Sequence, residues 1–240
     1  MKDEQKLPSI SDVISAYDKE YETSDLFRDS DRVYKWVLDV LSPQKEATLL
    51  DVAFGLGLLL KYAVQRNISC FGIDLSMSAA AQVHRQSPAM HVLIADGEKL
   101  PFPNHYFNYI TNLGSLEHFI NPDQGIKEMR RVLKKDGCAA ILLPNSYYLL
   151  DIVQKVMLKG IGPTHHQIIE RFATYHEWET LLQRNGFTVK ASYKYNFFLP
   201  KNKEDWDWFL KHPKRLVPPL IAPFIPFNLS FSFLYICTPF

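Results

Sequence analysis

The 240-residue sequence has little cysteine, almost no net charge and no internal repeat. Its three cysteines, Cys70, Cys138 and Cys237, have neither paired nor C-x-x-C spacing, which argues against a disulfide framework and a zinc site. The formal net charge is +1 and the basic residues are scattered, which argues against a nucleic-acid-binding surface. Residues 1–6 are polar and do not form a signal peptide, so we expect a reducing, cytoplasmic environment.

Charge is also missing from one long segment, residues 216–240, which raises the question of a membrane span. Four prolines interrupt this segment and argue against a continuous helix. They are Pro218, Pro219, Pro223 and Pro226. Aromatic residues at alternate positions from Phe231 to Tyr235 instead predict a final strand over residues 228–238.

Aromatic residues gather around this proline-rich stretch. They are Trp206, Trp208, Phe209, Phe224 and Phe227. Three interpretations stay open at this point: a loop packed on the core, a wall of an apolar substrate pocket, or a surface that touches a membrane.

The most informative segment is residues 49–57, LLDVAFGLG, followed by a helix-like stretch over residues 58–66. An apolar run ends in Asp51, and a turn with two glycines follows. Gly55 and Gly57 have no Cβ, so the backbone there can adopt positive φ and a ligand can approach it closely. The segment therefore predicts a buried strand, a tight turn and the start of a helix, with a carboxylate at the strand tip.

Two phosphate-binding interpretations of this turn fail. A dinucleotide fingerprint, G-x-G-x-x-G, requires a third glycine where Leu60 stands. A Walker-type loop requires Gly-Lys-Ser/Thr, which does not follow. The pattern D-x-A-x-G-x-G instead resembles the first motif of class I methyltransferases that use S-adenosylmethionine. These usually have glycine where Ala53 stands, and because alanine is the smallest replacement we expect binding to survive. The resemblance implies that Asp51, Ala53, Gly55 and Gly57 contact this cofactor.

Acids also end the next two apolar runs. Residues 69–73 lead into Asp74, which could accept both hydroxyls of a ribose. Residues 90–95 lead into Asp96, which could accept the amine of adenine, and Gly97 would leave room for the base. Because such strand ends meet at one edge of a parallel sheet, the three acids predict a nucleoside site.

The order of segments strengthens the resemblance. A strand over residues 106–113 precedes LEHF at 116–119, a helix over 123–133, a surface turn at 134–137 and a strand over 138–143. This order is similar to the frame of small-molecule class I methyltransferases of the UbiE type across residues 30–195. The resemblance implies four further cofactor contacts, at Leu75, Met77, Asn112 and Leu113.

The alternation of strands and helices predicts an α/β fold. The resemblance implies a Rossmann-like, doubly wound, seven-stranded sheet, mostly parallel with an antiparallel last strand. We expect an N-terminal helical lid over residues 1–42, a cofactor-binding core over 43–145, and a substrate-shaping insertion with the last strands over 146–240. In the lid, Tyr17 and Tyr21 share one helix face.

Several side chains are candidates for the methyl-accepting side of the site. His118 and His165 are candidate general bases, because the pKa of imidazole suits proton transfer near neutral pH. Candidate substrate contacts are Tyr17, Tyr21, Tyr147, His166 and Arg171. For the histidines and the lid tyrosines a purely structural role is the alternative. Adjacent His165 and His166 have no supporting cluster of ligands, so we expect no metal.

The resemblance implies methyl transfer from S-adenosylmethionine to a small or lipophilic acceptor by in-line displacement, with no nucleic acid. We expect no transmembrane segment, possible peripheral contact with a membrane, and a monomer or homodimer. A non-catalytic scaffold that binds the cofactor is the first alternative. A nucleic-acid methyltransferase is less favoured, because no Asn/Asp-Pro-Pro-Tyr/Phe motif stands at residues 112–115. A nicotinamide-dependent oxidoreductase is the weakest.

Overall fold

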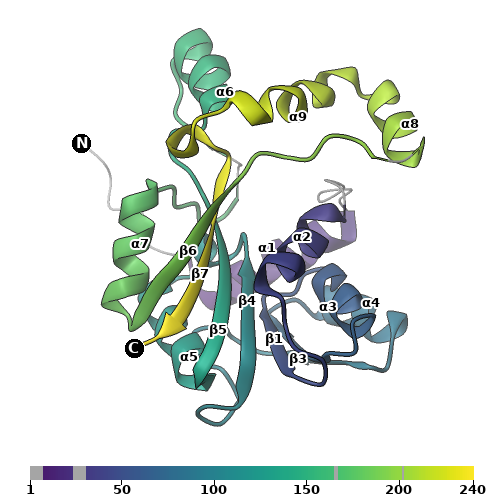
Figure 1. Ribbon diagram of the computed structural model, residues 1–240, viewed down its shortest axis with the longest axis vertical. Coiled ribbons are helices and arrows are strands. Elements are labelled where there is room, and N and C mark those ends of the chain that lie inside the picture. Colours follow the sequence, from purple (N-terminus) through teal and green to yellow (C-terminus); the bar gives the residue numbers. More distant parts are fainter. Residues whose placement is uncertain (1–7, 24–30, 165–166, 202) are drawn as a thin grey trace.

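The computed structural model describes residues 8–23, 31–164, 167–201 and 203–240. Their centre is a seven-stranded sheet in the order β3-β2-β1-β4-β5-β7-β6 (Figure 1). The strands are β1 (Thr48–Val52), β2 (Ser69–Asp74), β3 (Met90–Ile94), β4 (Phe107–Leu113), β5 (Leu133–Pro144), β6 (Phe187–Tyr195) and β7 (Ser232–Pro239). Strands β1 to β5 pair in parallel, whereas β7 runs antiparallel to both β5 and β6.

Helices connect and cover these strands. The longer helices are α1 (Ile10–Thr23), α2 (Arg32–Leu41), α3 (Leu58–Val64), α4 (Met77–Gln86), α5 (Pro122–Val132), α7 (Tyr175–Arg184) and α8 (Lys203–Lys211). The short helical turns are η1 (Leu116–His118), α6 (Leu149–Asp151), η2 (Ile152–Met157), η3 (Pro213–Leu216), α9 (Val217–Ile221), η4 (Ala222–Phe224) and η5 (Phe227–Leu229).

Two apolar layers show that the sheet is covered on both faces. One layer joins Val37 of α2, Leu60 of α3 and Val83 of α4 to the sheet. The other joins Met129 of α5 and Trp178 of α7 to the opposite face. Because both faces are covered, strands such as β1 are continuously apolar up to the acid near their tip. The predicted fold class, including the antiparallel last strand, is confirmed.

A capping box stands at the start of α7. The Thr174 hydroxyl accepts the backbone N–H of Glu177, and the Glu177 carboxylate accepts the backbone N–H of Thr174 at 2.7 Å. One turn into this helix, the Trp178 indole donates to the carbonyl of Pro144 at 2.7 Å. The helix is therefore fixed against the end of β5 by its own first turn.

Two strand boundaries differ from the prediction. Strand β5 begins at Leu133, so Lys134 and Lys135 lie in the strand and not in a surface turn, because Leu133 is buried and pairs with Phe107. Strand β7 begins only at Ser232. The carbonyls of Asn228 and Ser230 accept the side-chain amide of Asn145, so they are not available for pairing with β5.

Two outer segments leave the sheet at the carboxyl ends of its parallel strands. Residues 145–174 follow the end of β5, and residues 196–231 leave after Tyr195 and return at Ser232, which pairs with Pro144. We call residues 203–224 the arm; Figure 1 shows it crossing this end of the sheet. Within the described residues, no helix combines the length and apolar character needed to cross a bilayer.

Candidate functional site

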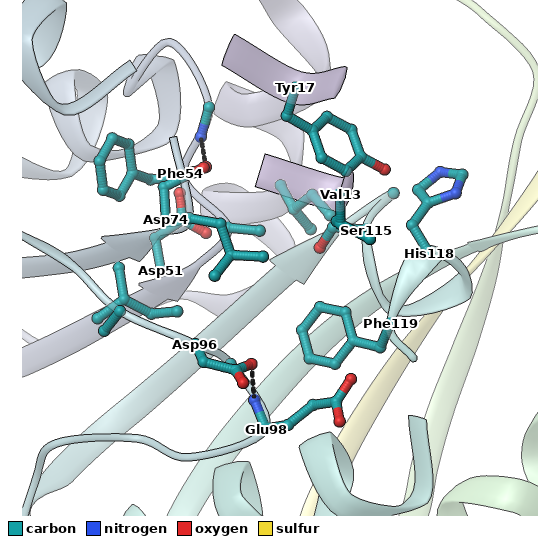
Figure 2. A pocket seen from close by; sticks show the side chains of 18 of the residues that line it. Val13, Tyr17, Asp51, Phe54, Asp74, Asp96, Glu98, Ser115, His118 and Phe119 are labelled. Atoms are coloured by element: carbon teal, nitrogen blue, oxygen red, sulfur yellow. Dashed lines mark hydrogen bonds between the residues drawn. The ribbon is translucent and has the colours of Figure 1, made fainter. Parts of the chain in front are cut away.

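A pocket lies at the carboxyl ends of β1, β2 and β4, under α1. Its volume is about 1200 Å³ when the open mouth is counted. Figure 2 shows Asp51 and Asp74 on one side of this pocket, and Tyr17 and His118 on the other. The pocket therefore brings together side chains from the lid, from the strand tips and from the loop after β4.

Asp51, in β1, is buried and lines this pocket. It accepts the Thr111 hydroxyl at 2.7 Å, from the neighbouring strand β4. Burial raises the pKa of Asp51 to about 7, because the charged form is poorly solvated there. A positively charged group next to Asp51 would favour its ionised form.

Asp74, at the tip of β2, holds the turn that follows β1. Its carboxylate accepts the backbone N–H of Gly55 and that of Ser76, each at 2.9 Å. Burial raises the pKa of Asp74, while these backbone donors oppose the rise. The acid thus connects two turns of the chain while it faces the pocket.

The turn itself needs left-handed backbone at three residues. The φ angles are 62° at Ala53, 55° at Gly55 and 70° at Gly57. Glycine is the residue that adopts such φ without strain, so Ala53 carries a conformational cost that its usual counterpart would avoid. A Cβ on Gly57 would lie 2.6 Å from Val83, so this glycine serves the packing of α3 on α4.

A second pair of acids lies beyond β3. Asp96 accepts the backbone N–H of Glu98 at 2.8 Å, and Glu98 accepts the backbone N–H of Asn121 at 2.8 Å. Gly97 lines the pocket, and a Cβ on it would lie 2.5 Å from the ring of Phe119, so no larger residue fits there. That Gly97 leaves room for a base stays a prediction.

The charges that line the pocket are all of one sign. Among the described lining residues four are acids and none is lysine or arginine. The acids are Asp51, Asp74, Asp96 and Glu98. Two buried lining atoms, Ser115 Oγ and Gln167 Oε1, have no hydrogen-bond partner among the described residues. The pocket therefore suits a polar, positively charged ligand and disfavours a ligand with phosphates.

Helix α1 closes the pocket from above. Val13, Tyr17 and Tyr21 of this helix line it. Asp18 fixes the helix to the rim, because its carboxylate accepts the Ser76 hydroxyl and the backbone N–H of Ser78. Asp18 thus connects the lid to the turn that Asp74 holds.

His118 lies on the side opposite the acids, with its ring edge-on to Tyr17 at 6.4 Å between centroids. Its Nδ1 contacts the carbonyl of Ile169. A carbonyl only accepts, so Nδ1 carries the proton and Nε2 is the nitrogen able to accept one. Nε2 lies 3.7 Å from Glu117, whose pKa burial raises to about 8.

Two predicted contact residues support the loop after β4 with their side chains. Asn112 donates to the carbonyl of Val52 at 3.1 Å and accepts the N–H of Leu116 at 3.0 Å. Arg171 donates to the carbonyls of Glu117, Phe119 and Ile120. The guanidinium thereby holds the loop that carries His118.

Comparison with known proteins agrees with this geometry. Residues 50–141 match the family model described as "Methyltransferase domain". Demethylmenaquinone methyltransferase of Chlorobaculum tepidum is 34% identical over 105 residues, which cover 43% of each chain. The ubiquinone/menaquinone biosynthesis C-methyltransferase UbiE of Neisseria meningitidis is 25% identical over 204 residues, which cover 75% of this chain and 83% of that one.

This chain carries a methyltransferase domain. In fold it is similar to a chain from the complex between the Haloferax volcanii Trm112 methyltransferase activator and a methyltransferase. That likeness has a TM-score of 0.69 at 15% identity and covers 96% of this chain and 97% of the other. These matches support the predicted class I methyltransferase family and enzyme class. The match spans less than half of the Chlorobaculum enzyme.

The remaining predicted site residues fall into three groups. Leu75 and Leu113 line the pocket with Gly97. Met77 and Tyr147 are exposed and lie outside the lining. His165 and His166 lie outside the described residues. The roles of all these residues stay predictions.

Several lining residues of the pocket were not among the predicted site residues. The polar and aromatic ones near the predicted motifs include Glu98, Ser115, Phe119 and Gln167. Glu98 stands two residues after Asp96, and Ser115 and Phe119 flank the LEH segment, so a wider window around each motif would have included them. Gln167 directly follows His166, so a wider window there would have included it as well.

Proposed function

We propose that this domain transfers a methyl group from S-adenosylmethionine to a small, lipophilic acceptor. The observation that carries the proposal is the pocket lining, which holds four carboxylates and, among the described residues, no lysine or arginine. S-adenosylmethionine has a cationic sulfonium and a cationic amine, whereas a nicotinamide dinucleotide brings a negatively charged pyrophosphate. The charge of the pocket favours the first ligand.

The residues present fit this cofactor. Asp74 would accept the ribose hydroxyls, Asp96 the adenine amine, and Asp51 would face the cationic part of the molecule. The buried Ser115 Oγ and Gln167 Oε1 offer further polar partners. When bound, the cofactor supplies a methyl group on a positively charged sulfur, which is a good leaving group.

The chain's own contribution is to exclude water and to place the acceptor. Val13 and Tyr17 of the lid, with Phe119 and Ile120 of the loop after β4, give the pocket an apolar wall. His118 lies at this wall and would take a proton from an acceptor hydroxyl at Nε2, because Nδ1 donates to Ile169. Positioning within such a wall can supply much of the acceleration.

The acceptor class is proposed from the relatives together with this wall. The relatives described above are named for menaquinone and ubiquinone synthesis. A hydroquinone combines a flat aromatic ring, ionisable hydroxyls and a lipophilic tail. Such a molecule fits an apolar pocket with one histidine, so a hydroquinone is the first acceptor to test.

The test is calorimetric titration of the protein with S-adenosylhomocysteine, with NADH as the control ligand. The product is preferable because it cannot react. We expect saturable binding of S-adenosylhomocysteine and none of NADH. Turnover is then measured with methyl-labelled S-adenosylmethionine and a water-soluble, short-chain hydroquinone, and label should enter the acceptor.

Binding of NADH in place of S-adenosylhomocysteine by a folded sample would refute the cofactor assignment. Binding of S-adenosylhomocysteine without label transfer to any hydroquinone would refute the acceptor class and leave the cofactor assignment standing. His118→Asn serves as the matched variant, because it keeps a donor to Ile169 and removes the proton acceptor. We expect it to lower turnover and to leave cofactor affinity within about twofold.

A further inference from the structure

The arm, residues 203–224, lies at the same edge of the sheet as the pocket. Strand β6 ends at Tyr195 and β7 begins at Ser232, and Ser232 pairs with Pro144 at the carboxyl end of β5. The chain between them therefore projects from the edge at which the strand tips form the pocket. Figure 1 shows the arm as a chain of short helices across this edge.

The base of the arm is fixed to the body of the protein. Lys194 donates to the carbonyl of Ile225, and the Asn196 side chain accepts the N–H of Phe231, each at 2.7 Å. The Arg32 guanidinium lies 4.8 Å from the ring centroid of Phe198. Between these anchors α8 and α9 pack chiefly on the helical turns next to them, η3 and η4. The arm is thus held at both ends and open along its length.

Bulky apolar side chains are exposed along the arm. They are Trp206, Leu210, Val217, Leu220 and Phe224. Phe224 is 85% exposed and Leu210 is 71% exposed. None of the five lines the pocket. Single exposed apolar residues are ordinary, but such a group within one short segment is typical of an interaction surface.

Positive charge accompanies this apolar surface after Trp208, whereas the acids of the arm all lie before it, within residues 204–207. Lys211, Lys214 and Arg215 are exposed, and no ion pair is recorded for them within the described residues. Residues 208–240 contain no aspartate or glutamate. Basic side chains beside exposed aromatic and aliphatic ones complement a layer of anionic headgroups above hydrocarbon. Protein–protein interfaces are depleted in lysine relative to the rest of the surface, which disfavours a protein partner here.

We propose that the arm docks the protein on a lipid bilayer that contains anionic phospholipid. Leu210, Leu220 and Phe224 enter the headgroup boundary, and the basic side chains pair with lipid phosphates. The prolines keep the arm in short turns that lie in the interface. The docking brings the pocket edge to the bilayer; that this delivers a lipophilic acceptor rests on the proposed function.

The experiment is co-sedimentation of the full chain with vesicles of phosphatidylcholine alone and of phosphatidylcholine mixed with phosphatidylglycerol. We expect binding to the mixed vesicles, at least about tenfold weaker binding to phosphatidylcholine, and weakening as salt is raised. The affinity for S-adenosylhomocysteine is measured for every variant in solution, so that failure of the cofactor site is distinguished from loss of vesicle binding.

Matched variants separate the arm from the rest of the surface. Phe224→Ser should weaken binding to mixed vesicles at least about fivefold. Phe240→Ser is its control, because Phe240 is 69% exposed but follows β7 at the opposite end of the sheet. The double variant Lys211→Glu/Lys214→Glu should remove the preference for phosphatidylglycerol. Lys45→Glu/Lys135→Glu, at the amino ends of the parallel strands, should not.

Two results would overturn the proposal. One is binding to mixed vesicles that Phe224→Ser and the Lys211/Lys214 reversal leave unchanged. The other is no binding to either vesicle. If light scattering then shows a dimer that Phe224→Ser converts to a monomer, the arm is an interface between two copies of the chain. Loss of vesicle binding in the arm variants with unchanged S-adenosylhomocysteine affinity supports it.

Discussion

Two regions of this chain differ in where they place apolar and charged residues. In the cofactor half, residues 48–144, apolar side chains fill both faces of the sheet and acids line the pocket. In the outer segments, residues 145–174 and 196–231, apolar side chains such as Met157 and Phe224 are exposed to solvent. The first arrangement is typical of an interior site, and the second is typical of an interaction surface.

The same residue type therefore has different consequences in the two regions. A buried aromatic in the cofactor half contributes to folding, and an exposed aromatic in the arm contributes nothing to folding and is available for binding. Burial raises the pKa values of Asp51 and Asp74 in the pocket, because it disfavours their charged forms. Paired substitutions, one in each region, can therefore test this difference.

The largest difference is expected between two phenylalanines. Phe107 is fully buried, so Phe107→Ala should lower the free energy of unfolding by about 3–5 kcal/mol. Phe224→Ala in the arm should change it by less than about 0.5 kcal/mol. Urea denaturation of both variants measures this. Equal losses would mean that the arm is part of the folded core and would remove the contrast.

The next effect concerns cofactor affinity. Asp74→Ala removes the acceptor for Gly55 and Ser76 and the group proposed to hold the ribose, so S-adenosylhomocysteine should bind about tenfold to hundredfold more weakly. Asp207→Ala, an exposed acid of the arm, is the control and should leave the affinity unchanged. Calorimetry measures both. An unchanged affinity in Asp74→Ala would contradict the ribose assignment.

A pH-dependent stability is expected from Glu117. Its folded pKa of about 8 lies above the ordinary value of 4.5, so its contribution to stability is full below about pH 4.5 and is lost as pH rises through 8. Glu117→Gln is neutral at every pH. The free energy of unfolding of the wild type relative to this variant should therefore fall by roughly 1–3 kcal/mol over that range.

Urea denaturation at several pH values gives this comparison. Asp207→Asn in the arm is the matched control, and its difference from the wild type should be flat over the same range. A flat difference for Glu117→Gln as well would show that Glu117 is ionised in the folded protein, against its burial.

The smallest effect concerns the turn after β1. Ala53 has φ 62°, so Ala53→Gly should raise the free energy of unfolding by about 0.5–1 kcal/mol. Gly160 has φ 68° in an outer segment, and a Cβ there would meet no atom within 4 Å. Gly160→Ala should therefore lower the free energy of unfolding by a similar amount. Thermal unfolding of the pair measures both, and equal signs would refute the backbone explanation.

Much of the cofactor half could be predicted from the sequence because its signals are local. Apolar runs that end in an acid placed Asp51 and Asp74 at strand tips that the sheet then brought together, and a glycine turn follows the first of them. The capping box of Thr174 and Glu177 is likewise a signal between residues three positions apart. Such patterns depend on residues a few positions apart, and the parallel pairing of the strands then brings their tips together.

Other features depend on contacts between distant residues and gave no local signal. The space beside Gly97 is filled by Phe119, and Asn145 withdraws the carbonyls of Asn228 and Ser230 from the last strand. The support of the His118 loop by Arg171 joins residues more than fifty positions apart. The sequence identified these residue types as notable but could not show which partner each would meet.

The antiparallel pairing of β6 and β7 has a consequence for how this protein can vary. Tyr195 and Ser232 are paired neighbours in the sheet, so the 196–231 segment begins and ends at almost the same point. Chain entropy depends only weakly on the length of such a loop. Insertions, deletions or exchange of the whole segment can therefore change the surface that the protein presents and leave the sheet and its pocket intact. The segment is an interchangeable module carried by one hairpin.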